Sequence, residues 1–328
     1  MSTNVGDRNA GLAAPQAQVW GFDARTGIDS RNYFAPGAKI FYVDQNNTLA
    51  VDAGNLGEDP SVPLATVAAA VALVRPYQGD TIILGANDDW QYAAGLRNTS
   101  IAETLVIPAT TGGFRIVGTG TNPLGVIWEP VVADDFCITV NACDVLIEGI
   151  GFTGSNGVAG NGIYVDWDGT TVYGENVTIR NCFFDDGIDI AIQLEFSWYG
   201  QIYNNWFAEC DEYGIYTDGG GSGCGYCDIH SNRFVNCGTA AIALLGSAND
   251  NDVHHNHIYN SSALSGAAAT NEGINTTGGA RNLVHHNTLS CLLPVPAAGD
   301  FDDFCNAAAT DAWSQNYLLD GPSVTNPV

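Results

Sequence analysis

The segment CDIHSNRF (Cys227–Phe234) returns as DVHHNHI (Asp252–Ile258) and again as LVHHNTL (Leu283–Leu289). Each copy contains an apolar residue, two polar residues, an asparagine, one variable residue and a second apolar residue. The copies follow one another at intervals of 20 to 50 residues, the period of repeat proteins in which each unit stacks on its neighbours. This stretch therefore predicts a solenoid.

Further segments share the same form. They are FRIVGTG (114–120), VLIEGIGF (145–152), VTIRNCFF (177–184), GQIYNNWF (200–207) and AWSQNYL (312–318). Asparagine and glycine tolerate a left-handed backbone at a tight turn, so their recurrence predicts one turn per coil. Aligning all the segments gives a predicted file of turn residues: Gly118, Gly149, Asn181, Asn205, Asn232, Asn256, Asn287 and Asn316.

A second repeat lies between these turns and alternates in polarity. Its copies are GIYVD (162–166), AIQLE (191–195), GIYTD (214–218), AIALL (241–245) and GINTT (273–277). Alternation with period two is typical of a half-buried strand, and no helical periodicity accompanies it. We expect the isoleucine of each copy to point inward and the residue after it to point to solvent.

Short strands joined by asparagine turns resemble the right-handed parallel β-helix of the pectate-lyase-like superfamily, over roughly residues 80–321. In that superfamily an asparagine ladder marks one turn of each coil. The resemblance implies an all-β, right-handed parallel β-helix with an N-terminal capping strand and helix and an extended N-terminal arm. It indicates no single activity, because this fold hosts many.

The histidines fall within the repeat. His230, His254 and His285 share one position before the asparagine, and His255 and His286 share the next. Adjacent strands lie about 4.8 Å apart, so like side chains should stack from coil to coil. Structural stacking is the favoured interpretation. A metal bound by His230, His254 and His285, and a catalytic base, stay open as alternatives.

One outward column contains carboxylates. Asp166, Glu195 and Asp218 end three successive strands, and Tyr164, Gln193 and Tyr216 form the neighbouring column. Three interpretations stay open: a solvated acidic face, a strip that binds a glycan or a cation such as Ca²⁺, and a catalytic pair for glycoside hydrolysis. No lysine or arginine lies in these columns, and the motifs of alginate epimerases and polygalacturonases are absent from the sequence.

The ends of the solenoid need covers. We expect an extended arm at residues 1–38, a strand and a capping helix at 39–110, β-helix coils at 111–321 and a polar tail at 322–328. Thr66 is the predicted N-cap of the helix, and Pro76 is predicted to stop it. The arm is either a disordered tail or an anchor that orders against another subunit.

Composition limits the partners. The 328 residues carry a formal net charge of −26, which repels nucleic acid, and no run of about 18 apolar residues predicts a membrane span. The N-terminus lacks a basic segment followed by an apolar one, so synthesis in a host cytoplasm without a signal peptide is expected.

The cysteine count is odd. Cys210 and Cys237 share one register, and buried thiols are favoured there over a disulfide.

These features are similar to those of virion-associated β-helix proteins of tailed phages and related viruses, with the resemblance resting on GAKIFYVDQNN (37–47) and the helix and strand after it. It implies a non-enzymatic capsid decoration, spike or fibre at the virion surface. Residues 1–38 would bind other capsid or tail proteins, the coils would form a homo-oligomer (a trimer is favoured), and a host glycan is a candidate ligand. The alternative is a polysaccharide lyase or hydrolase, a depolymerase that uses Asp166, Glu195 and Asp218. No cofactor is expected apart from Ca²⁺ at those carboxylates.

Overall fold

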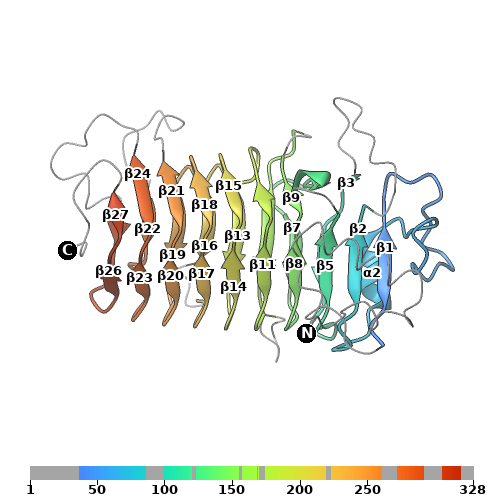
Figure 1. Ribbon diagram of the computed structural model, residues 1–328, viewed down its shortest axis with the longest axis horizontal. Helices are drawn as coiled ribbons and strands as arrows, with labels where there is room; N and C mark the ends of the chain where they lie inside the picture. Colours follow the sequence, from blue (N-terminus) through green and yellow to red (C-terminus); the bar gives the residue numbers. More distant parts are fainter. Residues whose placement is uncertain are drawn as a thin grey trace, which may run out of the picture.

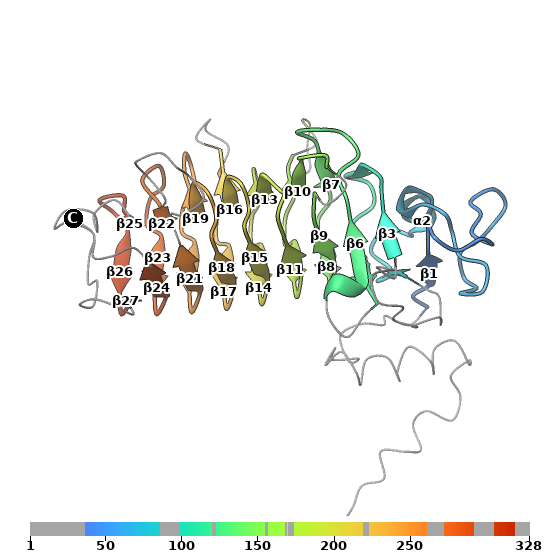
Figure 2. The same cartoon turned by 90° about the horizontal axis from the view of Figure 1, so that it is seen from above.

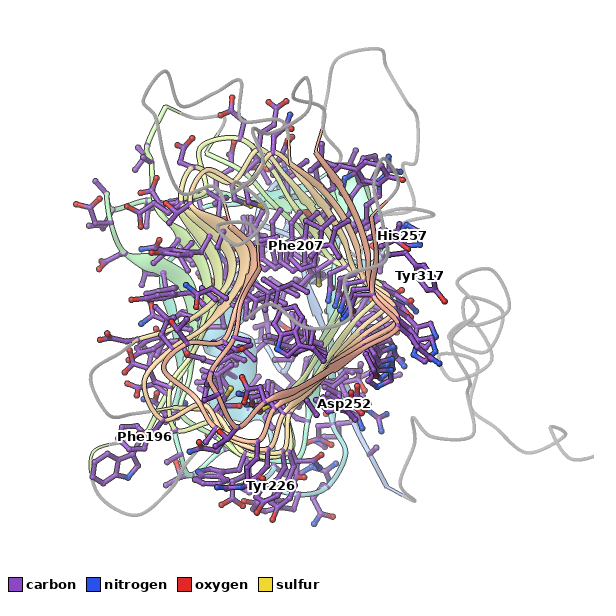
Figure 3. The ribbon with its side chains drawn as sticks, turned by 90° about the vertical axis from the view of Figure 1, so that its left-hand side faces the viewer. Phe196, Phe207, Tyr226, Asp252, His257 and Tyr317 are labelled. Carbon is purple, nitrogen blue, oxygen red and sulfur yellow. The ribbon has the colours of Figure 1, made fainter. Side chains whose placement is uncertain are left out.

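The structure is a computed structural model that describes residues 37–85, 99–119, 123–154, 157–167, 169, 174–218, 223–260, 272–291 and 305–318. Its strands stack side by side into an elongated solenoid (Figure 1), and a view along the axis shows a three-sided cross-section (Figure 3). Within these ranges the strands form three sheets, of ten, nine and eight strands, and the paired strands are parallel throughout. From β2 (Thr81–Leu84) onward the chain visits the three sheets in turn, so each circuit adds one strand to each.

Sheet A contains β1 (Ile40–Val43), β2 (Thr81–Leu84), β5 (Arg115–Gly118), β8 (Leu146–Glu148), β11 (Thr178–Arg180), β14 (Gln201–Tyr203), β17 (Asp228–His230), β20 (Asp252–His254), β23 (Leu283–His285) and β26 (Ala312–Ser314). Sheet B contains β3 (Thr99–Ile101), β6 (Val126–Trp128), β9 (Gly151–Phe152), β12 (Phe183–Phe184), β15 (Trp206–Ala208), β18 (Arg233–Val235), β21 (His257–Asn260), β24 (Thr288–Cys291) and β27 (Tyr317–Leu318).

Sheet C contains β4 (Leu105–Ile107), β7 (Phe136–Val140), β10 (Asn161–Val165), β13 (Ile190–Leu194), β16 (Tyr213–Thr217), β19 (Ala240–Leu244), β22 (Glu272–Asn275) and β25 (Cys305–Asn306). Its strands line one side of the solenoid in Figure 2. The expected inward isoleucines of this sheet are confirmed, because all of them are fully buried and pair in register: Ile163, Ile192, Ile215, Ile242 and Ile274.

Aromatic rings fill the interior beneath sheet B. Phe207 lies inside the solenoid (Figure 3) and stacks between Phe184 and Phe234, with ring centroids 5.0 and 4.4 Å away. Phe152 extends the stack on the other side of Phe184, at 4.9 Å. Because register pairing places identical rings one above another, the core of these coils is a continuous column of parallel rings.

The corner between sheets A and B contains the asparagine ladder. Asn205, Asn232 and Asn256 each donate a side-chain N–H to a backbone carbonyl of the coil before, and a second to the amide oxygen of the next asparagine. Asn287 continues the file to Asn316. All five are buried, so the ladder satisfies polar groups that water cannot reach.

The expected file was wrong for its first three members. Gly118, Gly149 and Asn181 lie one position earlier in the register, and Cys182 takes the ladder position beside Asn205, whose Oδ1 accepts from the Cys182 amide. The amide of Asn181 instead donates to Glu148. The sequence alignment slipped because the pattern allowed either one or two polar residues before the turn.

The left-handed conformation also lies one position earlier than expected. It belongs to the residue before each ladder asparagine, with φ of 54° to 56° at Asn204, Ser231, His255, His286 and Gln315. The ladder asparagines are absent from the positive-φ residues. They recur because of their side-chain hydrogen bonds, whereas the turn itself accepts several residue types.

One helix, α2 (Val67–Leu73), lies at the N-terminal end of the stack beside β1 (Figure 1). Thr66 is its N-cap and accepts a hydrogen bond from the Ala69 amide, as predicted, and the helix ends before Pro76. Val67, Ala70 and Val71 are buried in the common core. Sheet A has no break at residue 110, since β2 pairs in register with β5. Residues 1–36 and 322–328 lie outside the described residues.

Candidate functional site

The outer face of sheet C presents a column of three polar side chains. Tyr164 on β10, Gln193 on β13 and Tyr216 on β16 are register neighbours, and each is half-buried. They point outward because the alternate residues of these strands fill the core. The structure therefore places these three predicted ligand residues together on one surface strip.

The carboxylates of the strip follow the strands. Asp166 and Glu195 are the first residues after β10 and β13, and their amides donate to Val140 and Val165 of the preceding coil. Asp218 follows β16 and is exposed. Register continuity beyond the strand ends thus aligns the predicted carboxylate column.

Glu195 is held by two neighbours. Its Oε2 accepts a hydrogen bond from the Tyr164 hydroxyl at 2.8 Å, and its Oε1 accepts one from Gln193 Nε2 at 2.6 Å. Both carboxylate oxygens are therefore engaged by side chains of the same strip. This arrangement fixes the orientation of Glu195.

The pKa values of the two tyrosines are raised by burial and by the neighbouring carboxylates. Burial raises the pKa of Tyr164, and its hydrogen bond to Glu195 and the charge of Asp166 raise it further. Burial, then the charge of Asp218, raises the pKa of Tyr216. Both hydroxyls consequently keep their protons at neutral pH and act as hydrogen-bond donors.

Aromatic rings border the polar column. Phe136 stacks on Tyr164 at 4.9 Å, and Tyr213 stacks on Tyr216 at 4.3 Å. Trp167 contacts Phe196 at 5.1 Å at the end of the strip. Phe196 projects outward at the corner after sheet C (Figure 3). Aromatic faces beside carboxylates and hydroxyls provide both stacking and hydrogen-bonding groups for a hydroxylated ligand.

Neither this strip nor the histidine columns group three metal ligands among the described residues. Among the residues that the structure describes, no group of three or more His, Cys, Asp or Glu side chains is arranged to hold a metal ion. In the strip, both oxygens of Glu195 accept hydrogen bonds from Tyr164 and Gln193. In this arrangement Glu195 does not direct an oxygen to a Ca²⁺ ion that it would share with a neighbouring carboxylate.

The histidines form a second outer array, on sheet A. His254 stacks between His230 and His285, with ring centroids 5.0 and 5.1 Å apart and ring planes within 3° and 11° of parallel. Tyr203 continues the stack at 5.0 Å from His230. Parallel stacked rings direct their nitrogen lone pairs along parallel lines, so His230, His254 and His285 cannot converge on one ion.

Aspartates on the same face bind this column, which the sequence reasoning missed. His254 Nε2 lies 3.0 Å from Asp228 Oδ1, and His285 Nε2 lies 3.0 Å from Asp252 Oδ1. The signal was present: in DIH and DVH the acid and the imidazole are two residues apart on a strand, and therefore on one face. Asp252 projects outward from sheet A in Figure 3.

An exposed aromatic and cationic group on sheet B was also missed. The Arg233 guanidinium lies over the ring of Trp206 at 5.0 Å and near that of Tyr259 at 5.7 Å. Register pairing of β15, β18 and β21 brings these residues together from three coils. The sequence repeat did not predict this group, because the residue type at these positions changes from coil to coil.

Comparison with known families identifies the solenoid. The family described as "Right handed beta helix region" matches residues 134–289, which run from just before β7 into β24. Residues 134–289 are a right-handed β-helix. This confirms the fold class expected from the repeats, and sheets A, B and C are the three faces of the β-helix.

Solved structures that match the chain include a pectate lyase, a viral protein and a tailspike protein. A pectate lyase of Bacillus sp. N165, in complex with trigalacturonate, has 15% identity and a TM-score of 0.47 and covers 91% of this chain and 87% of its own. ORF18 of Geobacillus virus E2 has 11% identity and a TM-score of 0.48, with 97% of this chain and 62% of its own covered. The Dettilon tailspike protein has 12% identity and a TM-score of 0.39, with 92% and 74% covered. No curated protein matches the sequence.

Within the described ranges, no helix is long and apolar enough to span a bilayer.

Proposed function

We propose that this chain is a non-enzymatic structural protein of a virion, in which the β-helix projects and binds a host-surface glycan along the outer strip of sheet C. The observation that carries glycan binding is the geometry of Glu195, fixed by Tyr164 and Gln193 between bordering aromatic rings. A preorganised surface of this kind binds with little loss of side-chain entropy.

The strip suits a sugar chain for two reasons. Its hydroxyl, amide and carboxylate groups lie along successive strands about 4.8 Å apart, and sugar hydroxyls can both donate to and accept from such groups. Its rings at Phe136 and Tyr213 pack beside the polar column and offer apolar edges to the C–H faces of a sugar.

Binding is favoured over catalysis by the contacts of the carboxylate. A catalytic carboxylate must reach the reacting atoms of the substrate, whereas both oxygens of Glu195 already accept hydrogen bonds from Tyr164 and Gln193. A different contact supports the depolymerase alternative. The Tyr164 hydroxyl interacts with Asp166 as well as with Glu195, so it lies between two carboxylates. In that alternative, a lyase or hydrolase would use Asp166, Glu195 and Asp218.

The virion assignment is supported by the resemblance of residues 37–85 to virion-associated β-helix proteins, and by the confirmed capped helix at Thr66. In this proposal residues 1–38 anchor the chain to capsid or tail proteins, and the β-helices assemble as a homo-oligomer, with a trimer favoured. Deletion of residues 1–38 should leave a folded β-helix that no longer joins the particle. Unchanged incorporation would remove the anchoring role.

A glycan array tests the binding site. The wild-type chain should retain a defined set of host glycans, and Tyr216→Ala should lose them. Tyr317→Ala provides the matched control, since Tyr317 is an exposed tyrosine on sheet B and projects from another face (Figure 3). Release of shortened glycan products by the wild type, abolished in Glu195→Gln, would establish the enzyme instead. Retention of no glycan, or equal retention by Tyr216→Ala, would overturn this site.

A further inference from the structure

Two pairs of imidazoles meet at the corner between sheets A and B. The Nδ1 atoms of His254 and His255 lie 2.8 Å apart, and those of His285 and His286 lie 2.6 Å apart. One coil separates the pairs, and both columns stack, with His255 and His286 at 5.0 Å. Each pair therefore presents two ring nitrogens that face one another within a single coil.

The backbone at the turn creates this geometry. His255 and His286 have φ of 54°, the left-handed position before the ladder asparagine. This conformation turns each ring nearly perpendicular to that of its predecessor, at 87° and 81°. Perpendicular rings let two in-plane nitrogen lone pairs converge on one point, which the parallel rings of successive coils cannot do.

A carboxylate lies beside the first histidine in each pair. A carboxylate only accepts hydrogen bonds, so His254 donates Nε2–H to Asp228 Oδ1. His285 Nε2 lies 3.0 Å from Asp252 Oδ1, an ion-pair distance without hydrogen-bond geometry. In the neutral His254 imidazole the lone pair is then on Nδ1, the atom that faces the partner ring. Donation of the distant ring N–H to a carboxylate is the usual outer contact of a metal-binding histidine.

We propose that each pair, His254 with His255 and His285 with His286, chelates one divalent late first-row transition metal ion such as Zn²⁺ or Ni²⁺. Two nitrogens each about 2.0–2.1 Å from a tetrahedral Zn²⁺ lie about 3.3 Å apart, so the facing atoms need to open by only about 0.5–0.7 Å. Metal binding displaces the proton shared between the two Nδ1 atoms. The second ring takes up a proton at Nε2 from solvent, so both imidazoles stay neutral with their Nδ1 lone pairs on the ion. Water completes the coordination, since each site has two protein ligands.

The coil before the pairs shows what the sites require. His230 occupies the same column as His254, but its Nδ1 faces the hydroxyl of Ser231 at 3.1 Å. Its Nε2 is 3.9 Å from Asp228, beyond hydrogen-bond distance. This coil lacks both the second nitrogen and the close carboxylate, so we assign it no ion.

The stoichiometry of the full chain tests the proposal. After equilibrium dialysis against Zn²⁺ with excess Ca²⁺ to occupy acidic surface groups, the wild type should retain two ions. His255→Asn and His286→Asn should each retain one, and the double variant none. Asparagine keeps the turn, because Asn204 occupies the same position with φ of 56°. His257→Asn, at an exposed histidine outside the two pairs, should retain two and serves as the control.

Two further measurements address the sites one at a time. Asp228→Asn should weaken one of the two sites about 10–100-fold and leave the other unchanged. Anomalous diffraction at the zinc edge from a soaked wild-type crystal should place one peak between the Nδ1 atoms of each pair. Absence of those peaks, or a double variant that retains as many ions as the wild type, would overturn the sites. Neither outcome bears on glycan binding at sheet C.

Discussion

The side-chain amide of Asn232 donates a hydrogen bond to Asn256 Oδ1 at 3.0 Å, across one full coil of the β-helix. The same oxygen accepts the backbone N–H of Asn232, also at 3.0 Å. Asn256 repeats both contacts toward Asn287, and Asn287 toward Asn316. Hydrogen bonds in such a chain polarise one another, so the buried ladder ties each coil to the next.

Replacement of one ladder residue should therefore destabilise the β-helix strongly. Asn256→Ala removes the acceptor of two Asn232 N–H groups and the donor to Ile229, all in a buried place. Because these buried groups would be left without partners, we expect the unfolding free energy to fall by about 3 kcal/mol. Guanidinium denaturation followed by tryptophan fluorescence measures it. Gln201→Ala, on the exposed face of β14, should change stability by less than about 0.5 kcal/mol, and equal effects would contradict the ladder's role.

The interior ring column makes a second stability prediction. Phe207→Ala leaves a cavity between Phe184 and Phe234 and should lower the unfolding free energy by about 3–5 kcal/mol. Phe207→Leu should lower it by about 1.5 kcal/mol or less, because Ile258 and Leu289 occupy the same register in later coils. Denaturant midpoints of the two variants check the ranking, and a leucine variant as unstable as the alanine variant would show that the ring stack itself is required.

The sequence was sufficient for the fold and for part of the site. Strands and inward isoleucines were predictable because burial follows the period-two pattern, as at Ile192 and Ile215. The sequence located the ladder only to within one residue of its true position. Asn181 and Asn204 are asparagines in the same motif as the ladder residues, but they lie one register position earlier. A pattern does not reveal which residue takes φ near 55°.

Contacts between coils were harder to foresee. The hydrogen bond of Tyr164 to Glu195 and the cation–π contact of Arg233 with Trp206 each join residues from different repeats. Such contacts depend on side-chain length and rotamer once the register is fixed, and the linear pattern contains neither. Stacking of the imidazoles was predictable because identical residues recur at one register position.

Buried thiols should resist modification in the folded protein. Burial raises the pKa of Cys182 to about 12, and Cys210 and Cys237 are buried free thiols in one register, which agrees with the expectation from the repeat. A thiol reacts as its thiolate, so Cys182 should not react with iodoacetamide at pH 8. Peptide mass spectrometry should find these three sites modified only after denaturation. Labelling of Cys182 within minutes in the native state would contradict the packing of that coil.

Acid–base behaviour at the capping helix provides the last prediction. Glu103 accepts the Val67 amide at 2.8 Å, at the start of α2, and burial raises its pKa from 4.5 to about 7. The folded state therefore binds the proton more tightly than the unfolded state. The resulting stability is complete below about pH 4.5 and is lost as the pH rises through 7, by at most about 3 kcal/mol. Glu103→Gln removes this titration, so subtracting its unfolding free energy from that of the wild type should give a difference that falls between pH 4.5 and pH 7.5. A difference that stays constant over this range would show that Glu103 titrates alike in the folded and unfolded states. Glu58→Gln, at an exposed acid at the same N-terminal end of the β-helix, provides the control.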